Sequence, residues 1–281
     1  MKDIDGRAVA KTLREEVGEA AERLRGEGVV PTLAVVVPTD DEGTAWYVRS
    51  IAKTADKLGL RCRIEHLEAP SRDEVAARLR ALSADPEVHG IICQTPLPEG
   101  VSLADLGGHI APEKDIDGAN PQSLGRLAAG LRTWAPATAA AVLELLRRQE
   151  VKLTGARAVV VGRSTVVGKP AALLLLAESA TVTVCHSRTE DLQAVCREAD
   201  VLVAAVGRAK MIGAEFVKPG AIVIDVGTNP TPDGSLVGDV DYESVAPLAG
   251  AITPVPGGVG PVTTMLLLRN TVEAARLARE R

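Results

Sequence analysis

The stretch that decides the fold reads Ala158-Val-Val-Val-Gly162-Arg-Ser164-Thr-Val-Val-Gly168-Lys-Pro-Ala-Ala-Leu-Leu-Leu-Leu-Ala, followed by Thr181-Val-Thr-Val-Cys-His186-Ser-Arg188. A β-branched run, a turn containing glycine and serine, a helical run and a second β-branched run are typical of a βαβ unit. We expect its helix to begin just after Gly162 and to direct its free N–H groups at the turn, where a pyrophosphate would bind.

The spacing of this turn departs from the usual dinucleotide-binding pattern. Ser164 takes the middle position of G-x-G-x-x-G, and Val167 stands where the third glycine is expected. The turn is therefore compatible with a phosphate site, or with an ordinary strand-to-helix connection in a doubly wound sheet.

The end of the second strand favours NADP over NAD. Enzymes that use NAD usually place an acidic residue here to bind the ribose 2′-hydroxyl, whereas this chain has His186, Ser187 and Arg188, with Arg163 in the turn. Cationic side chains and hydroxyl donors suit a 2′-phosphate. We predict NADP as the cofactor; the alternative is that the two arginines are solvated surface charges.

The composition is that of an ordinary soluble globular protein. The 281 residues are 46% hydrophobic and 25% charged, which allows two domains. A net charge of −5 and only 2 Trp, 2 Tyr and 1 Phe argue against nucleic acid as a partner. Without a signal sequence or a long apolar run, we expect a cytoplasmic protein that does not bind membranes.

The four cysteines show no CxxC spacing and lie in or beside apolar runs. They are Cys62, Cys93, Cys185 and Cys196. We expect reduced, buried thiols, and with only four scattered histidines we expect no metal site.

Helical and strand patterns alternate along the first half of the chain. We expect helices over residues 5–24, 44–58 and 72–82, and strands over 32–37, 61–67 and 90–94. Gly59 is expected to cap the second helix. The alternation predicts an α/β domain with a mainly parallel sheet.

The second half continues the same alternation after the βαβ unit. We expect a linking helix over 138–148, strands over 200–206 and 221–226, a hairpin turn at Asp233-Gly234, a rigid loop over 252–263 and a final helix over 264–279 that covers the first domain. Gly207 and Gly227 end strands, where they permit close approach of a flat ligand. Glu190 and Asp191 are expected in the first turn of another helix.

Polar residues follow one strand of the first half. Ligands bind beyond the carboxyl ends of parallel strands, where Gln94 and Thr95 are expected. Asp115 and Asp117 follow in a loop before Gly118, and they are either ligand-binding carboxylates or loop and cap residues.

Several segments together resemble the FolD family, the methylenetetrahydrofolate dehydrogenase/methenyltetrahydrofolate cyclohydrolases. They are the helix with Tyr47, Gln94-Thr-Pro-Leu-Pro98, Lys114-Asp-Ile-Asp-Gly118, Gly162-Arg-Ser164 with Gly168, the run ending at Gly227, and Pro254-Val-Pro-Gly-Gly-Val-Gly-Pro261. The resemblance implies two α/β domains flanking a cleft. Residues 1–138 plus 263–281 would form the folate-binding catalytic domain, and 139–262 a Rossmann-like NADP-binding domain. It also implies a homodimer that acts in one-carbon metabolism and purine biosynthesis.

The resemblance also implies residue roles. Tyr47 would stack on the pterin, Asp117 would accept hydrogen bonds from its amino and ring N–H groups, and Gln94 would contact the reacting end of the folate. The substrate would also contact Ile51, Pro256, Gly257, Gly258 and Val259. The cofactor would contact Gly162, Arg163, Ser164, Gly168, Ser187, Arg188, Gly227, Thr228 and Thr263.

One departure from the family pattern concerns the second reaction. The family pattern Tyr-x-x-x-Lys supplies a lysine for the cyclohydrolase step, but Ile51 stands at that position. Lys53 lies about 240° around a helix from Tyr47, and only a local shift of register would bring it in. Hydride transfer needs no protein base, so we expect dehydrogenase activity with weak or absent cyclohydrolase activity. The alternatives are a fully bifunctional enzyme and a non-catalytic folate- and NADP-binding paralogue.

Overall fold

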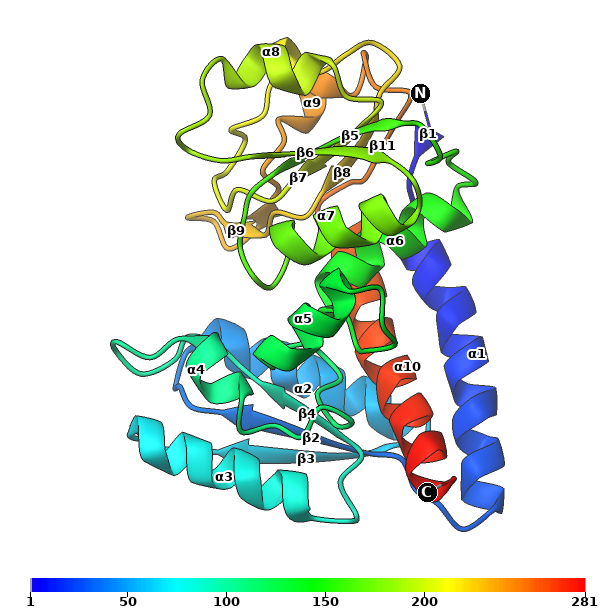
Figure 1. Cartoon of the computed structure of the whole chain (residues 1–281), viewed down its shortest axis with the longest axis vertical. Helices are drawn as coiled ribbons and strands as arrows, with labels where there is room; N and C mark the ends of the chain where they lie inside the picture. The colour runs from blue at the N-terminus through cyan, green and yellow to red at the C-terminus, as the bar shows by residue number, and fades with distance from the viewer. Residues whose placement is uncertain (1, 281) are drawn as a thin grey trace. The chain divides into compact units, whose positions relative to one another are not determined.

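The computed structural model describes residues 2–280, which divide into two compact units (Figure 1). The six-stranded unit comprises the chain up to Lys11 together with Thr138–Thr263. The three-stranded unit comprises Thr12–Ala137 and the chain from Thr264 onward. Each unit contains its own parallel sheet, so the α/β class predicted from the sequence is confirmed.

The six-stranded unit is doubly wound around a sheet of order β1-β11-β8-β7-β5-β6. Its strands are β1 (Lys2–Asp3), β5 (Arg157–Val161), β6 (Thr181–Cys185), β7 (Val201–Ala204), β8 (Ile222–Asp225) and β11 (Ala251–Ile252). The chain passes from β5 to β6 on one side and then returns to β7 on the other side of β5. The strand order therefore switches between β5 and β7, which is where ligands bind in such sheets.

Helices cover both faces of this sheet. Figure 1 shows α6 (Ala137–Arg148) and α7 (Gly168–Ala177) on one face, and α8 (Leu192–Arg197) and α9 (Tyr242–Val245) on the other. The second face contains the buried core in which Cys196 of α8 and Val245 of α9 join side chains of β5, β7 and β8. The 3-10 helix η1 (Ala214–Phe216) packs beside α8, and a hairpin pairs β9 (Asn229–Pro230) with β10 (Leu236–Val237).

The three-stranded unit has the sheet order β3-β2-β4. Its strands are β2 (Thr32–Val37), β3 (Arg61–His66) and β4 (Gly90–Cys93), and its helices include α2 (Glu42–Lys57), α3 (Arg72–Ala84), α4 (Leu103–Gly107) and α5 (Pro121–Ala128). All six residues of β2 are buried, as expected for a central parallel strand covered on both faces. Ala34 and Val36 face the core formed with α3, and Gly59, at φ 74°, follows the end of α2.

Two long helices contain residues of both units. Helix α1 (Gly6–Gly26) passes from one unit to the other after Lys11, and α10 (Val259–Arg279) does so after Thr263. Within the three-stranded unit, α10 is held by the Asn270 side chain, which donates to the Ile116 carbonyl at 2.9 Å. This contact agrees with the expectation that the last helix covers the first domain.

Three expectations about element boundaries were wrong. Helix α7 begins at Gly168 and not just after Gly162, because the Ser164 hydroxyl accepts hydrogen bonds from the N–H groups of Val167 and Gly168 and closes a turn first. Helix α10 begins inside the expected rigid loop, at Val259, since a proline is tolerated in a first turn. Asp191 is the N-cap of α8 and not part of its first turn.

Some elements were not anticipated from the sequence. Residues 2–3 form β1, which pairs with β11, so the beginning of the chain belongs to the six-stranded unit and not to the domain expected for residues 1–138. Helix α5 was also missed; it begins at Pro121 after the N-cap Asn120. These short elements carry too few residues for a periodic pattern.

Candidate functional site

The order of the three-stranded sheet switches between β2 and β4, and predicted substrate residues lie beside this point. Gln94 follows β4 and donates its backbone N–H to the Val36 carbonyl at 2.9 Å. The segment before Asp117 is held against β4, because Ile91 donates to the Lys114 carbonyl at 2.8 Å. Backbone hydrogen bonds therefore anchor Gln94 to β2 and the segment that leads to Asp117 to β4.

Tyr47, Asp117 and Thr264 lie together in the three-stranded unit. Burial, followed by the negative charge of Asp117, raises the pKa of Tyr47 to about 12, and its hydroxyl is hydrogen-bonded to Thr264. Burial raises the pKa of Asp117 to about 6, although the Ala137 N–H donates to its Oδ1 at 2.8 Å. An ionised carboxylate and a neutral phenol thus share one site at pH 7, as the predicted pterin contacts require. The sequence reasoning did not include Thr264.

Of the two roles expected for Asp115, ligand binding or support of the loop, the structure shows the second. Its carboxylate accepts hydrogen bonds from the N–H groups of Ala119 and Asn120 and from the Ser123 hydroxyl, at 2.8, 2.9 and 2.6 Å. Burial raises its pKa to about 7. Asp115 is fully buried, so it holds the loop that carries Asp117 and is not available to a ligand.

Position 51 faces the interior, whereas position 53 does not. Ile51 is 0% exposed, and Lys53 is on the exposed side of α2. The helix is continuous from Glu42 to Lys57, so the register shift that would bring Lys53 beside Tyr47 is absent from this part of the structure. Ile51 has no ammonium group, and Lys53 of α2 does not supply one in its place.

In the six-stranded unit, the turn after β5 lies at the switch point between β5 and β7. A Cβ at Gly162 would lie 2.1 Å from the Ala205 carbonyl oxygen after β7, and one at Gly168 would lie 2.1 Å from the Gly162 carbonyl oxygen. Both glycines are required by close backbone packing. The N–H groups of residues 163–166 donate to no acceptor in the described part of the chain. They are available to a pyrophosphate, so the turn fits a dinucleotide.

The residues predicted to contact a 2′-phosphate are exposed. Ser187 and Arg188 lie in the turn after β6, where the Arg188 N–H donates to His186 Nδ1 at 3.1 Å. Within residues 2–280, neither Arg163 nor Arg188 forms an ion pair. Two cationic side chains without a carboxylate partner fit a phosphate monoester.

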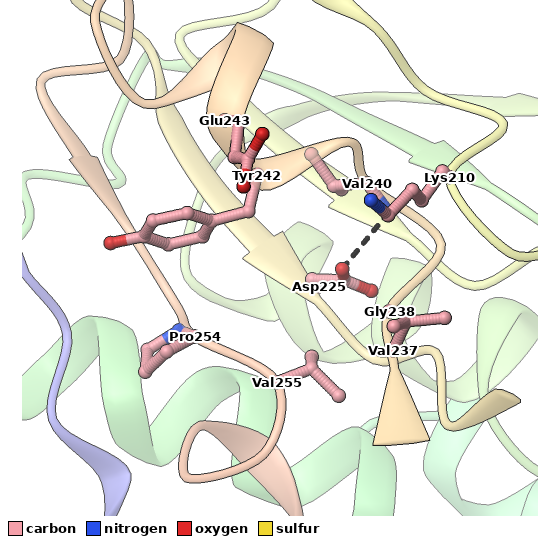
Figure 2. A pocket seen from close by; sticks show the side chains of 9 residues that line it. All are labelled: Lys210, Asp225, Val237, Gly238, Val240, Tyr242, Glu243, Pro254 and Val255. Carbon is pink, nitrogen blue, oxygen red and sulfur yellow. Dashed lines mark hydrogen bonds between the residues drawn. The ribbon is translucent and has the colours of Figure 1, made fainter. Parts of the chain in front are cut away.

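Gly227 and Thr228 follow β8 beside two buried carboxylates that the sequence reasoning did not identify. Asp225 is 3% exposed and Asp239 is 0% exposed. Both accept backbone hydrogen bonds from the segments that follow β7 and β8. Asp225 also lines a cavity of about 240 Å³ with Val240, Tyr242 and others (Figure 2). The available signal for Asp225 was an aspartate at the end of a strand, two residues before Gly227.

The Pro/Gly segment after β11 contributes the remaining predicted residues. Gly257 has φ 116°, a backbone conformation that favours glycine, and a Cβ at Gly6 would lie 1.8 Å from the Gly258 carbonyl oxygen. Pro256 is exposed, whereas Val259 is buried. Thr263 is also buried, and its hydroxyl donates to the Val259 carbonyl at 3.2 Å. The predicted site residues are therefore divided between the units, with Tyr47, Ile51, Gln94 and Asp117 in the three-stranded unit and the rest in the other.

Two family models match this chain. The catalytic domain of tetrahydrofolate dehydrogenase/cyclohydrolase matches residues 4–117, and the NAD(P)-binding domain of the same enzymes matches residues 136–279. The chain belongs to the FolD family. A protein named bifunctional protein FolD from Parafrankia sp. (strain EAN1pec) is 62% identical over 275 residues, which cover 98% of this chain and 99% of that protein. This confirms the family resemblance seen in the sequence.

Solved structures of FolD relatives have the same fold. Bifunctional FolD from Campylobacter jejuni has a TM-score of 0.96 and 39% identity, with 99% of each chain covered. FolD from Trypanosoma brucei, solved with NADP cofactor and an inhibitor, has a TM-score of 0.94 and 38% identity, with coverage of 99% of this chain and 98% of that one. The two-domain fold with a Rossmann-like NAD(P)-binding domain and the NADP cofactor expected from the sequence are both confirmed. Among the described residues, every helix is too short or too polar to span a bilayer.

Proposed function

We propose that this FolD-family enzyme oxidises 5,10-methylenetetrahydrofolate to 5,10-methenyltetrahydrofolate with NADP, and that its cyclohydrolase activity is weak or absent. The observation that carries the second part is Ile51, a fully buried hydrocarbon at the position of the family lysine. The exposed position of Lys53 supports it further.

The three-stranded unit would bind the folate. The Asp117 carboxylate has two oxygens that can accept parallel N–H bonds from the aminopyrimidinone edge of the pterin. Tyr47 presents a neutral aromatic ring next to it, since a phenol with a pKa of about 12 is protonated at pH 7. Gln94, held at the end of β4, would contact the reacting end of the substrate.

The six-stranded unit would bind the cofactor. NADP supplies the hydride acceptor. The turn at residues 162–168 would bind the pyrophosphate through its free N–H groups, and Arg163, Ser187 and Arg188 would bind the 2′-phosphate. Gly227, Thr228 and Thr263 are proposed on the family resemblance to complete this site.

The two reactions place different demands on the protein. In the first, a hydride leaves the methylene carbon while a nitrogen lone pair of the substrate forms the C=N bond, so alignment is the main requirement. In the second, water adds to the methenyl carbon, a C–N bond breaks and a proton is released. Acid–base assistance to such a step is worth about 10² to 10⁴ in rate. Without the lysine, the protein would lack this acid–base assistance.

The test follows both products after mixing the enzyme with 5,10-methylenetetrahydrofolate and NADP. We expect NADPH and the methenyl chromophore to rise together, with the methenyl species lost no faster than in buffer alone. Rapid enzyme-dependent loss would support the bifunctional alternative, which the names of the relatives favour. NADP binding without turnover would support the non-catalytic alternative.

We also propose a homodimer in which the edge strand β6 contacts a second copy. β6 ends the six-stranded sheet, and an unpaired edge strand is available for pairing. Val184 on this strand is 39% exposed and Leu176 on the adjacent α7 is 59% exposed. Exposed apolar groups beside an open edge favour association.

A further inference from the structure

Two buried aspartates in the six-stranded unit bind backbone in succession: Asp225 binds the segment that carries Asp239, and Asp239 binds the segment after β7. The Asp225 carboxylate accepts hydrogen bonds from the N–H groups of Gly227, Asp239 and Val240, each at 2.9 Å. Asp225 therefore fixes the backbone of Asp239 while it also turns the chain after β8.

The Asp239 carboxylate in turn binds the segment that follows β7. Its Oδ2 accepts from the N–H groups of Val206 and Gly207 at 2.6 and 2.9 Å, and its Oδ1 accepts from the Arg208 N–H and the Asn229 side-chain amide, both at 2.9 Å. Four donors thus converge on one carboxylate that is 0% exposed. Such charge-assisted hydrogen bonds fix backbone firmly.

Two glycines make this arrangement possible. A Cβ at Gly227 would lie 2.3 Å from Asp239 Oδ1, and a Cβ at Gly238 would lie 1.8 Å from Asp225 Oδ2. Neither glycine has a positive φ, so space for the carboxylates, and not backbone conformation, requires glycine here. Gly227, which lies two residues after Asp225 in the sequence, thus faces Asp239. Gly238, which directly precedes Asp239, faces Asp225.

The bound segment borders the dinucleotide turn. Val206, Gly207 and Arg208 follow Ala205, whose carbonyl oxygen would lie 2.1 Å from a Cβ at Gly162. The segments after β5 and β7 are therefore in direct contact at the switch point of the sheet. Asn229 links the same carboxylate to Thr228, the next residue back along the chain.

We propose that Asp239 is a positioning residue for cofactor binding, which fixes the Val206–Arg208 segment and Thr228 in the conformation that receives the dinucleotide. This inference rests on the NADP site of the proposed function. Asp239 itself is enclosed by four protein donors and cannot contact the cofactor or the substrate. Its effect is therefore exerted entirely through the backbone it binds.

Asp239→Asn tests this role, with the dissociation constants of NADP and 5,10-methylenetetrahydrofolate measured separately by calorimetry. The amide presents one oxygen and one NH₂ group to four donors, so we expect NADP to bind at least about tenfold more weakly. Folate binding should stay within about twofold, because Asp117 and Tyr47 lie in the other unit. Asp233→Asn is the matched control, since Asp233 is exposed and bonds only within the hairpin turn.

A reciprocal exchange of the side chains at positions 239 and 229 distinguishes a positioning role of Asp239 from a general effect on the stability of the protein. In the double variant Asp239→Asn with Asn229→Asp, the new amide of residue 239 faces a carboxylate at residue 229. We expect part of the lost NADP affinity to return. A double variant that binds NADP no better than Asp239→Asn would overturn the proposal. Wild-type NADP affinity in Asp239→Asn would overturn it too, as would equal loss of both ligands.

If Asp239→Asn does not fold, Asn229→Ala tests the positioning role of Asp239 instead. It removes one donor and leaves three backbone hydrogen bonds to the carboxylate. Weaker NADP binding with unchanged folate binding is expected, and unchanged NADP affinity would overturn the proposal. Failure of the wild-type protein to bind NADP would instead refute the proposed function, before any variant is compared.

Discussion

We expect the balance between the two proposed activities to depend on Ile51. Ile51→Lys would place an ammonium group at a position that is 0% exposed, where burial lowers the pKa of a lysine and makes it a competent proton carrier. We expect enzyme-dependent hydrolysis of 5,10-methenyltetrahydrofolate to rise by about 10² or more. The rate of NADPH formation should change by only a few fold. The measurement is the loss of methenyl absorbance with and without enzyme.

Ile51→Met is the matched control for that substitution. It supplies a straight side chain without an amine, and such apolar exchanges usually cost less than about 1.5 kcal/mol of stability. We expect no gain in hydrolysis from it. A folded Ile51→Lys variant that hydrolyses no faster than Ile51→Met would contradict the role assigned to position 51.

We expect Asp117 to give folate binding a pH dependence, whose sign follows from the direction of its pKa shift. Its pKa is raised to about 6 by burial, and only the ionised form accepts two N–H bonds. The KM for folate should be constant above about pH 6 and should rise as the pH falls through that value. Asp117→Asn should raise KM by about tenfold or more and remove this dependence. A wild-type KM that stays flat down to pH 5 would show that Asp117 does not bind the substrate as an anion.

At the residue scale, sequence motifs identify the side chains of a candidate site better than the residues that hold its backbone in place. Tyr47 and Asp117 stand in recognisable segments, and the structure places them together. Asp239 could not be predicted, because its four donors come from residues 206–208 and from Asn229, which meet only after the strands of the sheet have paired.

At the element scale, the junction between β5 and α7 depends on one close approach. Gly168→Ala would place a Cβ 2.1 Å from the Gly162 carbonyl oxygen. Overpacking of this kind costs about 1 to 3 kcal/mol. We therefore expect a lower free energy of unfolding in urea and weaker NADP binding.

Gly125→Ala is expected to have the opposite effect on stability to Gly168→Ala. Gly125 lies inside α5 with no atom within 4 Å of its would-be Cβ and without a positive φ. Alanine is favoured over glycine in a helix by about 1 kcal/mol, so this variant should be more stable, with unchanged NADP binding. If the two variants unfold at the same urea concentration, the close approach at Gly168 is not the determining contact.

Strands were easier to predict than the ends of helices. The β-branched run at 32–37 coincides with β2, and the run before Gly162 coincides with β5 within one residue. Helix α7 starts late because a side-chain turn at Ser164 competes with the first helical hydrogen bonds. Helix α10 starts in a segment rich in glycine and proline, which local preference alone indicates to be a loop.

At the scale of the whole molecule, the edge strand β6 is where we expect a second copy to bind. Val184→Arg would place a charge on its exposed side, at a residue that is 39% exposed. We expect sedimentation to show a dimer for the wild type and a monomer for this variant. Lys11→Ala, on the exposed side of α1, should leave the dimer intact. A monomeric wild type would refute the assembly itself.

The passage of α1 and α10 from one unit to the other has a consequence for biosynthesis. Residues 12–137 are synthesised early, but their unit includes α10, whose Asn270 binds the Ile116 carbonyl. The unit therefore cannot finish folding on the ribosome until the last helix emerges from the exit tunnel. A nascent chain stalled before α10 should remain open to proteases over residues 12–137, while the released chain becomes resistant. We therefore expect the completion of translation to set the time at which the three-stranded unit becomes native.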